Sequence, residues 1–365
     1  MRMRDVARVY AVATLVFFVV AGLDRLTQHT SYNHYALQAD AWLHGRWDLP
    51  GGPPAYAEWN DFAVFEGRTY VSFPPLPALL VAPFVALAGS PERCLDGLFF
   101  VTLAGAAPAL LFAALETLRL RGYSQRSSRE NTLLALLFAF GTVYFSCAVQ
   151  GTVWFAGHVV ATAFLAAYLL VSIDAKYPVL AGAALACACM TRPTTLLAAP
   201  LFLSELLRTR DTLGTRARAL TGFAIPLGAS FVVAGWCNVA RFGDPLVFGH
   251  EHLQVFWHAR ITTWGLFSTH YLSKNLGAAL TTLPWFPGPF PGPAAPFRVS
   301  LHGLALWFTT PLYLWLLWPT WRNPRRLGVA LAVSAALVAG ADLLYQNTGW
   351  WQFGGCFCLL CCFWH

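Results

Sequence analysis

Charged side chains are scarce in this chain of 365 residues, because Asp, Glu, Lys and Arg together make up 11% of it. In ordinary soluble domains roughly a quarter of the residues are charged. Hydrophobic residues reach 57%, and the mean hydropathy is +0.53. This composition excludes an ordinary soluble protein. It also excludes a disordered chain, since so apolar a sequence more than offsets its ordering entropy.

Other residues and motifs that are scarce or absent restrict the possible functions of the protein. Lysine occurs only at Lys176 and Lys274, so nearly all basic charge is arginine, and its placement is best tested first against membrane orientation. No run of the form G-x-x-x-x-G-K-[ST] occurs, which argues against a nucleotide-driven pump. The nine cysteines give no disulfide framework. Four of them crowd the end of the chain without an upstream His or Cys pair, so neither a metal site nor a cofactor is predicted.

The apolar runs predict an all-α membrane protein with about nine transmembrane helices, because a crossing needs about 20 apolar residues. The candidate spans are residues 6–23, 97–118, 131–149, 152–173, 177–190, 193–207, 219–239, 299–318 and 328–345. A further apolar run, 74–89, contains Pro75, Pro77 and Pro83 and makes a poor uninterrupted helix. It is predicted to lie in the interface without crossing.

The arginines fix the predicted orientation. With the N-terminus in the cytoplasm, 15 of the 24 basic residues fall on the cytoplasmic side, as the positive-inside rule requires. The same rule splits 177–207 into two short spans at Thr191-Arg192-Pro193, which leaves Arg192 at the outer surface. Two external loops follow, at 24–96 and 240–298. No cytoplasmic loop exceeds about a dozen residues, which excludes a cytosolic Rossmann unit of about 30 residues.

Residues 32–45 in the first external loop predict a short amphipathic helix lying in the membrane interface. Its aromatic residues Tyr32, Tyr35 and Trp42 share the face expected to be embedded in lipid. Asn33, Asp40 and His44 cluster on a polar flank, and Gly45 ends the helix. This flank is either a solvated face or a functional one, in which Asp40 acts as a base toward an acceptor hydroxyl or amine.

Several motifs resemble the GT-C integral-membrane glycosyltransferases, a group that includes protein O-mannosyltransferases and the lipid A aminoarabinose transferase. They occur in this order: Tyr35-x-x-x-Ala39 with Gly45; Gly67-Arg68-x-Tyr70; Phe73-Pro74-Pro75; Thr191-Arg192-Pro193; Asn238-x-x-Arg241-Phe242-Gly243-Asp244-Pro245; and Gly349-Trp350-Trp351-Gln352-Phe353-Gly354. The last resembles a motif of uncharacterised bacterial members. The resemblance covers about residues 6–354, and we take residues 1–354 as one transmembrane domain.

The resemblance implies transfer of a sugar from a polyprenyl-phosphate carrier to a lipid, glycan or protein acceptor on the outer side of a bacterial inner membrane. It implies no nucleic-acid partner. The family places its acidic pair three to four residues before the tyrosine, where this chain has Ser31 and Tyr32. Asp40 and Asp61 are therefore substitute candidates for the catalytic base. The predicted substrate-binding residues are Asn33, His34, His44, Arg68, His158, Arg192 and Arg241.

Arginine suits a phosphate because its guanidinium donates two parallel hydrogen bonds. Arg192 also has a simpler interpretation, in which it extends to lipid headgroups, and His158 is otherwise a buried histidine of the helix core. Two other functions remain open: a transporter or lipid flippase, and an inactive remnant. The second arises because residues 355–365 form a cysteine-rich tail that is expected to mark a truncated or frameshifted end.

Overall fold

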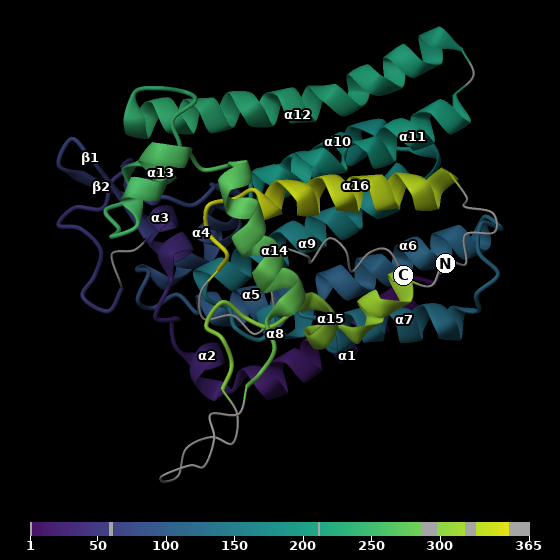
Figure 1. Cartoon of the computed structure of the whole chain (residues 1–365), viewed down its shortest axis with the longest axis horizontal. Coiled ribbons are helices and arrows are strands. Elements are labelled where there is room, and N and C mark those ends of the chain that lie inside the picture. The colour runs from purple at the N-terminus through teal and green to yellow at the C-terminus, as the bar shows by residue number, and fades with distance from the viewer. Residues whose placement is uncertain (1, 58–60, 211, 286–297, 318–325, 350–365) are drawn as a thin grey trace.

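The computed structural model describes residues 2–57, 61–210, 212–285, 298–317 and 326–349. The chain is mostly helical, with long helices running side by side and one small β-hairpin at one end (Figure 1). The helices are α1 (Met3–Ala21), α2 (Leu23–Thr27), α3 (His34–Leu43), α4 (Leu76–Ala88), α5 (Asp96–Ala104), α6 (Ala106–Leu120), α7 (Ser128–Gly141), α8 (Tyr144–Ala148), α9 (Val153–Ser172), α10 (Pro178–Cys189), α11 (Pro200–Thr209), α12 (Leu213–Phe242), α13 (His258–Trp264), α14 (Leu272–Thr281), α15 (Leu306–Thr309) and α16 (Arg326–Leu343). The strands are β1 (Phe62–Phe65) and β2 (Arg68–Val71).

Helix α9 lies in the middle of the bundle and is apolar on every side. It packs against α6 and α10, and α10 packs in turn against α12. A helix that is hydrophobic all round is buried in a large core or spans a membrane. Three described segments are long and apolar enough to cross a membrane: Asp96–Leu120, Val153–Ala175 and Leu213–Phe242. They correspond to three of the predicted spans; the total of nine crossings stays a prediction.

Several predicted spans are not single continuous helices, and two of them show why. Residues 299–318 form α15 and a 3-10 helix (Pro311–Leu317) within the described part of the chain. Pro311 explains the break, because proline disfavours helical backbone at the residue before it, and Thr310 has φ −136° and ψ 78°. Residues 131–149 are divided between α7 and α8 at Thr142, which has extended backbone and whose hydroxyl accepts the Tyr144 N–H.

Arginine-rich turns meet at the end of the bundle opposite the hairpin. The Asp174 carboxylate contacts Arg121, Arg208 and the Tyr123 hydroxyl. The buried Glu205 carboxylate binds Arg208 and, at 2.7 Å, the backbone N–H of Asp174. Figure 1 shows the ends of α6, α11 and α12 that carry these turns on the same side of the molecule as the N-terminus. These arginines thus gather at one end of the bundle, and the side of the membrane that this end faces stays a prediction.

Three features of the first external loop differ from the prediction. Helix α3 does not present its aromatic side outward, because Tyr35 is buried against Phe73 and Phe100 and α3 packs on α4. Helix α4 is 13 residues long and continues through Pro83 without a break. The all-α prediction also missed the hairpin. Its two-residue turn, Glu66-Gly67, has positive φ at both positions, which is the geometry of a type I′ turn.

Candidate functional site

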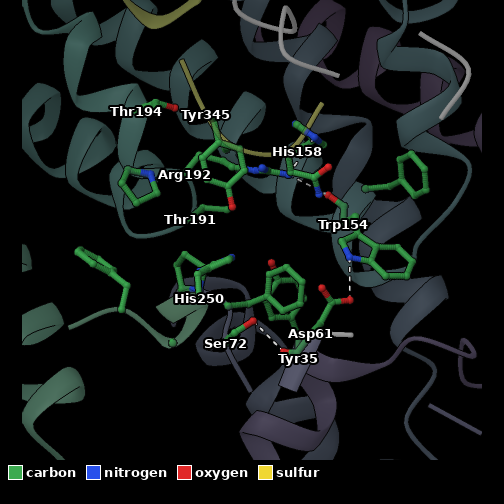
Figure 2. Close-up of a pocket in the computed structure, with 18 of the residues that line it drawn as sticks. Tyr35, Asp61, Ser72, Trp154, His158, Thr191, Arg192, Thr194, His250 and Tyr345 are labelled. Atoms are coloured by element: carbon green, nitrogen blue, oxygen red, sulfur yellow. Dashed lines mark hydrogen bonds between the residues drawn. The ribbon is translucent and has the colours of Figure 1, made fainter. Parts of the chain in front are cut away.

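A cavity of about 1550 Å³ opens between the two loops predicted to be external and the neighbouring ends of α9, α10 and α12. Figure 2 shows Arg192, His158 and Trp154 on one side of it and Asp61, Ser72 and Tyr35 on the other. The cavity also extends along the bundle past apolar residues of α9 and α12, among them Ala161, Leu165, Phe231 and Ala234. We call the part lined by Arg192, His158, Trp154, Asp61, Ser72 and Tyr35 the polar chamber. We call the part lined by the apolar residues of α9 and α12 the apolar arm.

The hairpin holds Asp61 at the cavity. The register pairs Phe62 with Val71, and the Asp61 carbonyl extends the ladder by accepting the Ser72 N–H at 3.2 Å and the Ser72 hydroxyl at 2.7 Å. The Asp61 carboxylate accepts a hydrogen bond from the Trp154 indole N–H at 3.0 Å. The Asp61 side chain keeps 20% of its surface exposed. The carboxylate is thus oriented by a fixed donor and still open to the cavity.

Arg192 faces this carboxylate from the break between α10 and α11. The backbone turns sharply there, because Pro193 begins a new 3-10 helix and Arg192 is extended. Its Nη2 lies 2.9 Å from His158 Nε2 and donates to the Trp154 carbonyl at 3.4 Å. The contact orients the guanidinium, and it requires the lone pair of a neutral imidazole at Nε2.

Trp154 connects the two sides of the site. Its indole N–H contacts the Asp61 carboxylate, and its backbone carbonyl accepts from Arg192. An acidic group and a cation are therefore held by one residue at the start of α9, across a cavity that a ligand can enter. This is the geometry expected of a site that binds an anion beside a base.

His250 also lines this cavity. Burial, together with the charges of Arg192 and Arg241, lowers the pKa of its imidazole to about 4. The ring is therefore neutral near pH 7. Asp342 at the end of α16 and Tyr345 beyond it also line the cavity.

His34 lies behind Asp61, outside the cavity. Its imidazole is fully buried, its Nε2 is 3.8 Å from Asp61 Oδ2, and neither ring nitrogen has a hydrogen-bond partner within the described part of the chain. It packs against the ring of Phe62 at 4.6 Å between centroids. Burial lowers the pKa of His34 to about 3, because the apolar surroundings disfavour the charged form.

This burial predicts a loss of stability in acid. The unfolded chain binds the proton near pH 6.5 and the folded chain near pH 3, so the free energy of unfolding falls by about 1.4 kcal/mol per pH unit across that interval. At pH 5 the loss from His34 is about 2 kcal/mol relative to pH 7.5. Thermal unfolding in detergent measures it. His34→Phe should lose less stability between pH 7.5 and 5 than the wild type.

The matched control is His44→Phe, because His44 is an exposed residue at the end of α3. This variant should keep the wild-type dependence on pH. If His34→Phe and the wild type lose the same stability on acidification, the buried imidazole does not carry the effect.

Several predicted site residues lie away from the cavity. Asp40 is on α3, where its Oδ1 is 3.4 Å from His44 Nδ1, and neither residue is among those that line the cavity. Asn33 is buried and structural: its amide donates to the Pro91 carbonyl, and its side-chain oxygen accepts from Tyr56. Arg68 is exposed at the start of β2.

Arg241 lines the cavity, but its guanidinium donates hydrogen bonds to other parts of the chain and so has a structural role. Nη1 donates to the Val71 carbonyl at 3.1 Å, Nη2 to the Asn238 side chain at 2.9 Å, and Nε to the Cys237 carbonyl at 3.1 Å. These bonds attach β2 to the end of α12. The structure thus gathers Asp61, His158 and Arg192 about the polar chamber, with Arg241 in its wall.

Sequence reasoning missed Ser72, Trp154 and Tyr345 as site residues. Trp154 carried one usable signal, since a tryptophan four residues before His158 lies on the same helical face. Ser72 and Tyr345 carried none, because their positions depend on the hairpin register and on the chain after α16. Within the described ranges, no group of three or more His, Cys, Asp or Glu residues could hold a metal ion. The terminal cysteines and residues 350–354 of the last motif lie outside those ranges.

None of the protein-family models and none of the curated proteins compared with this chain matches it. Its structure is similar to the crystal structure of the Archaeoglobus fulgidus oligosaccharyltransferase in the apo form, with a TM-score of 0.53 and 12% sequence identity. The chain shares the fold of this oligosaccharyltransferase. The match covers 98% of the chain and 50% of the archaeal protein, so the chain spans about half the length of that enzyme. The fold predicted from the motifs is supported at this level, and the subgroup stays a prediction.

Proposed function

We propose that this protein transfers a sugar from a polyprenyl-phosphate carrier to a hydroxyl or amine acceptor at the outer face of the membrane. One observation carries the proposal: Trp154 holds the Asp61 carboxylate and the Arg192 guanidinium on opposite sides of one cavity. The fold shared with an oligosaccharyltransferase supports it. So does the apolar arm past Leu165 and Phe231, which suits an isoprenoid chain.

The reaction needs few groups from the protein. The acceptor oxygen or nitrogen attacks the anomeric carbon of the sugar, the bond from that carbon to the phosphate oxygen breaks, and its electron pair leaves with the lipid phosphate. Arg192 stabilises that phosphate with paired hydrogen bonds. Asp61 takes the proton from the attacking acceptor. His158 orients Arg192 through the contact between His158 Nε2 and Arg192 Nη2.

A reconstituted assay tests the proposal. The purified full chain in liposomes should release polyprenyl phosphate from a polyprenyl-phosphate-linked hexose or pentose and attach the sugar to a lipid or oligosaccharide acceptor. The measurement is transfer of label from the sugar. If the labelled donor crosses the bilayer without losing its sugar, the protein is a transporter or flippase instead. If the donor neither crosses nor reacts although it binds, the chain is an inactive remnant.

A further inference from the structure

Tyr35 brings a hydroxyl group to the edge of the cavity. It lies in the first turn of α3, its ring is fixed between Phe73 and Phe100 with centroids 5.8 Å away from each, and only 2% of its surface is exposed. It nevertheless lines the cavity, next to Asp61 (Figure 2). The ring is therefore held rigidly, with its oxygen at the edge of the ligand space.

Gly157 makes room for this hydroxyl. A Cβ atom built on Gly157 would lie 2.9 Å from Tyr35 Oη and 3.9 Å from Arg192 Nε. The phenol and the guanidinium thus approach the same point on α9, from α3 and from the α10–α11 break. Glycine in a helix interior is less stable than alanine by about 0.5–1 kcal/mol. A glycine at this place is explained by the space that the Tyr35 hydroxyl occupies, since the contact with Arg192 would be an ordinary one.

The Tyr35 hydroxyl has no hydrogen-bond partner within the described part of the chain. Because this O–H lies at the cavity, near the Arg192 guanidinium, it is available to donate to a ligand that enters there. Burial raises the pKa of Tyr35, the Asp61 charge raises it further, and Arg192 opposes the shift. The phenol therefore stays protonated and can donate.

We propose that Tyr35 donates its hydroxyl hydrogen to a phosphate oxygen of the lipid-linked donor, beside Arg192, and that Gly157 is required because a side chain there would displace the phenol. The inference rests on the proposed function, since it names a further contact to the same donor. Tyr35 would be a catalytic residue in the sense that it touches the leaving phosphate. It donates a hydrogen bond and takes no proton.

Phosphate binding by matched variants tests this role. Farnesyl phosphate, a short polyprenyl phosphate, is titrated into the full chain in detergent and followed by calorimetry. Tyr35→Phe should weaken binding about tenfold or more, because it removes a hydrogen bond to a charged acceptor. Gly157→Ala should weaken it to a similar extent. Tyr10→Phe is the control, since the Tyr10 hydroxyl donates to the Thr102 carbonyl outside the cavity.

The double variant separates the proposal from general damage. In the wild type, the methyl group of Gly157→Ala would clash with the Tyr35 hydroxyl oxygen. Tyr35→Phe removes that oxygen, so adding Gly157→Ala to Tyr35→Phe should weaken binding no further. Additive losses, or unchanged binding by Tyr35→Phe, would overturn the role of Tyr35 and leave the proposed function standing. Failure of the wild-type chain to bind farnesyl phosphate would overturn both.

Discussion

Asp61→Asn should lower sugar transfer by at least about 100-fold, because a general base contributes 10²–10⁴-fold to such a reaction. Asparagine keeps the size of the side chain and can still accept the Trp154 N–H, but it cannot take a proton. The hairpin should be unaffected, since Ser72 bonds to the backbone carbonyl of Asp61. Initial rates with a polyprenyl-phosphate-linked sugar measure the effect, with farnesyl phosphate binding as the check on folding.

The control for this variant is Asp40→Asn. The sequence suggested Asp40 as the first candidate base and Asp61 as the second, but the geometry favours Asp61 because Asp40 is paired with His44 outside the cavity. Asp40→Asn should therefore retain nearly the full rate. Loss of transfer in Asp40→Asn together with a normal rate in Asp61→Asn would assign the base to α3 instead.

Arg192→Gln should weaken donor binding by about 10- to 100-fold, the cost of removing a hydrogen bond to a charged group. The KM for the donor should rise most. Arg192→Lys should recover part of the loss, because lysine restores the charge without the planar fork that fits a phosphate. Titration with farnesyl phosphate and a kinetic split of kcat from KM measure these effects.

Arg68→Gln is the matched control, since Arg68 is an exposed arginine of the predicted first external loop and does not line the cavity. Its donor affinity should equal that of the wild type. Equal affinities for Arg192→Gln and the wild type would instead support the interpretation of Arg192 as a contact to lipid headgroups.

The long helices could be predicted from the sequence because their signal is local. Residues 152–173 were predicted as one span, and α9 occupies Val153–Ser172. The break before Pro193 was predicted from proline chemistry, and it places Arg192 at the cavity. Apolar composition and proline each act over a few residues, so no knowledge of distant contacts is needed.

The candidate site was less predictable, because it depends on contacts between distant segments. Asp61 reaches the cavity through a hairpin of four-residue strands, which is too short to show a clear alternation. The pattern of α3 suggested a lipid-facing side, but that side packs on α4. Tyr35 was noted for its motif and not for its hydroxyl, since its contact with Gly157 joins residues that lie far apart in the chain.

The ionic cluster at the arginine-rich end also bears on how the protein is made. Asp174 precedes Arg208 by 34 residues, so the ribosome synthesises the acidic partner of the pair first. The α9–α10 turn therefore leaves the ribosome before Arg208, the partner of Asp174, has been synthesised. The cluster can form completely only after α11 has been translated. Its closure brings together the turns after α6 and α9 and the end of α11, so packing of this end cannot be completed before Arg208 has been translated.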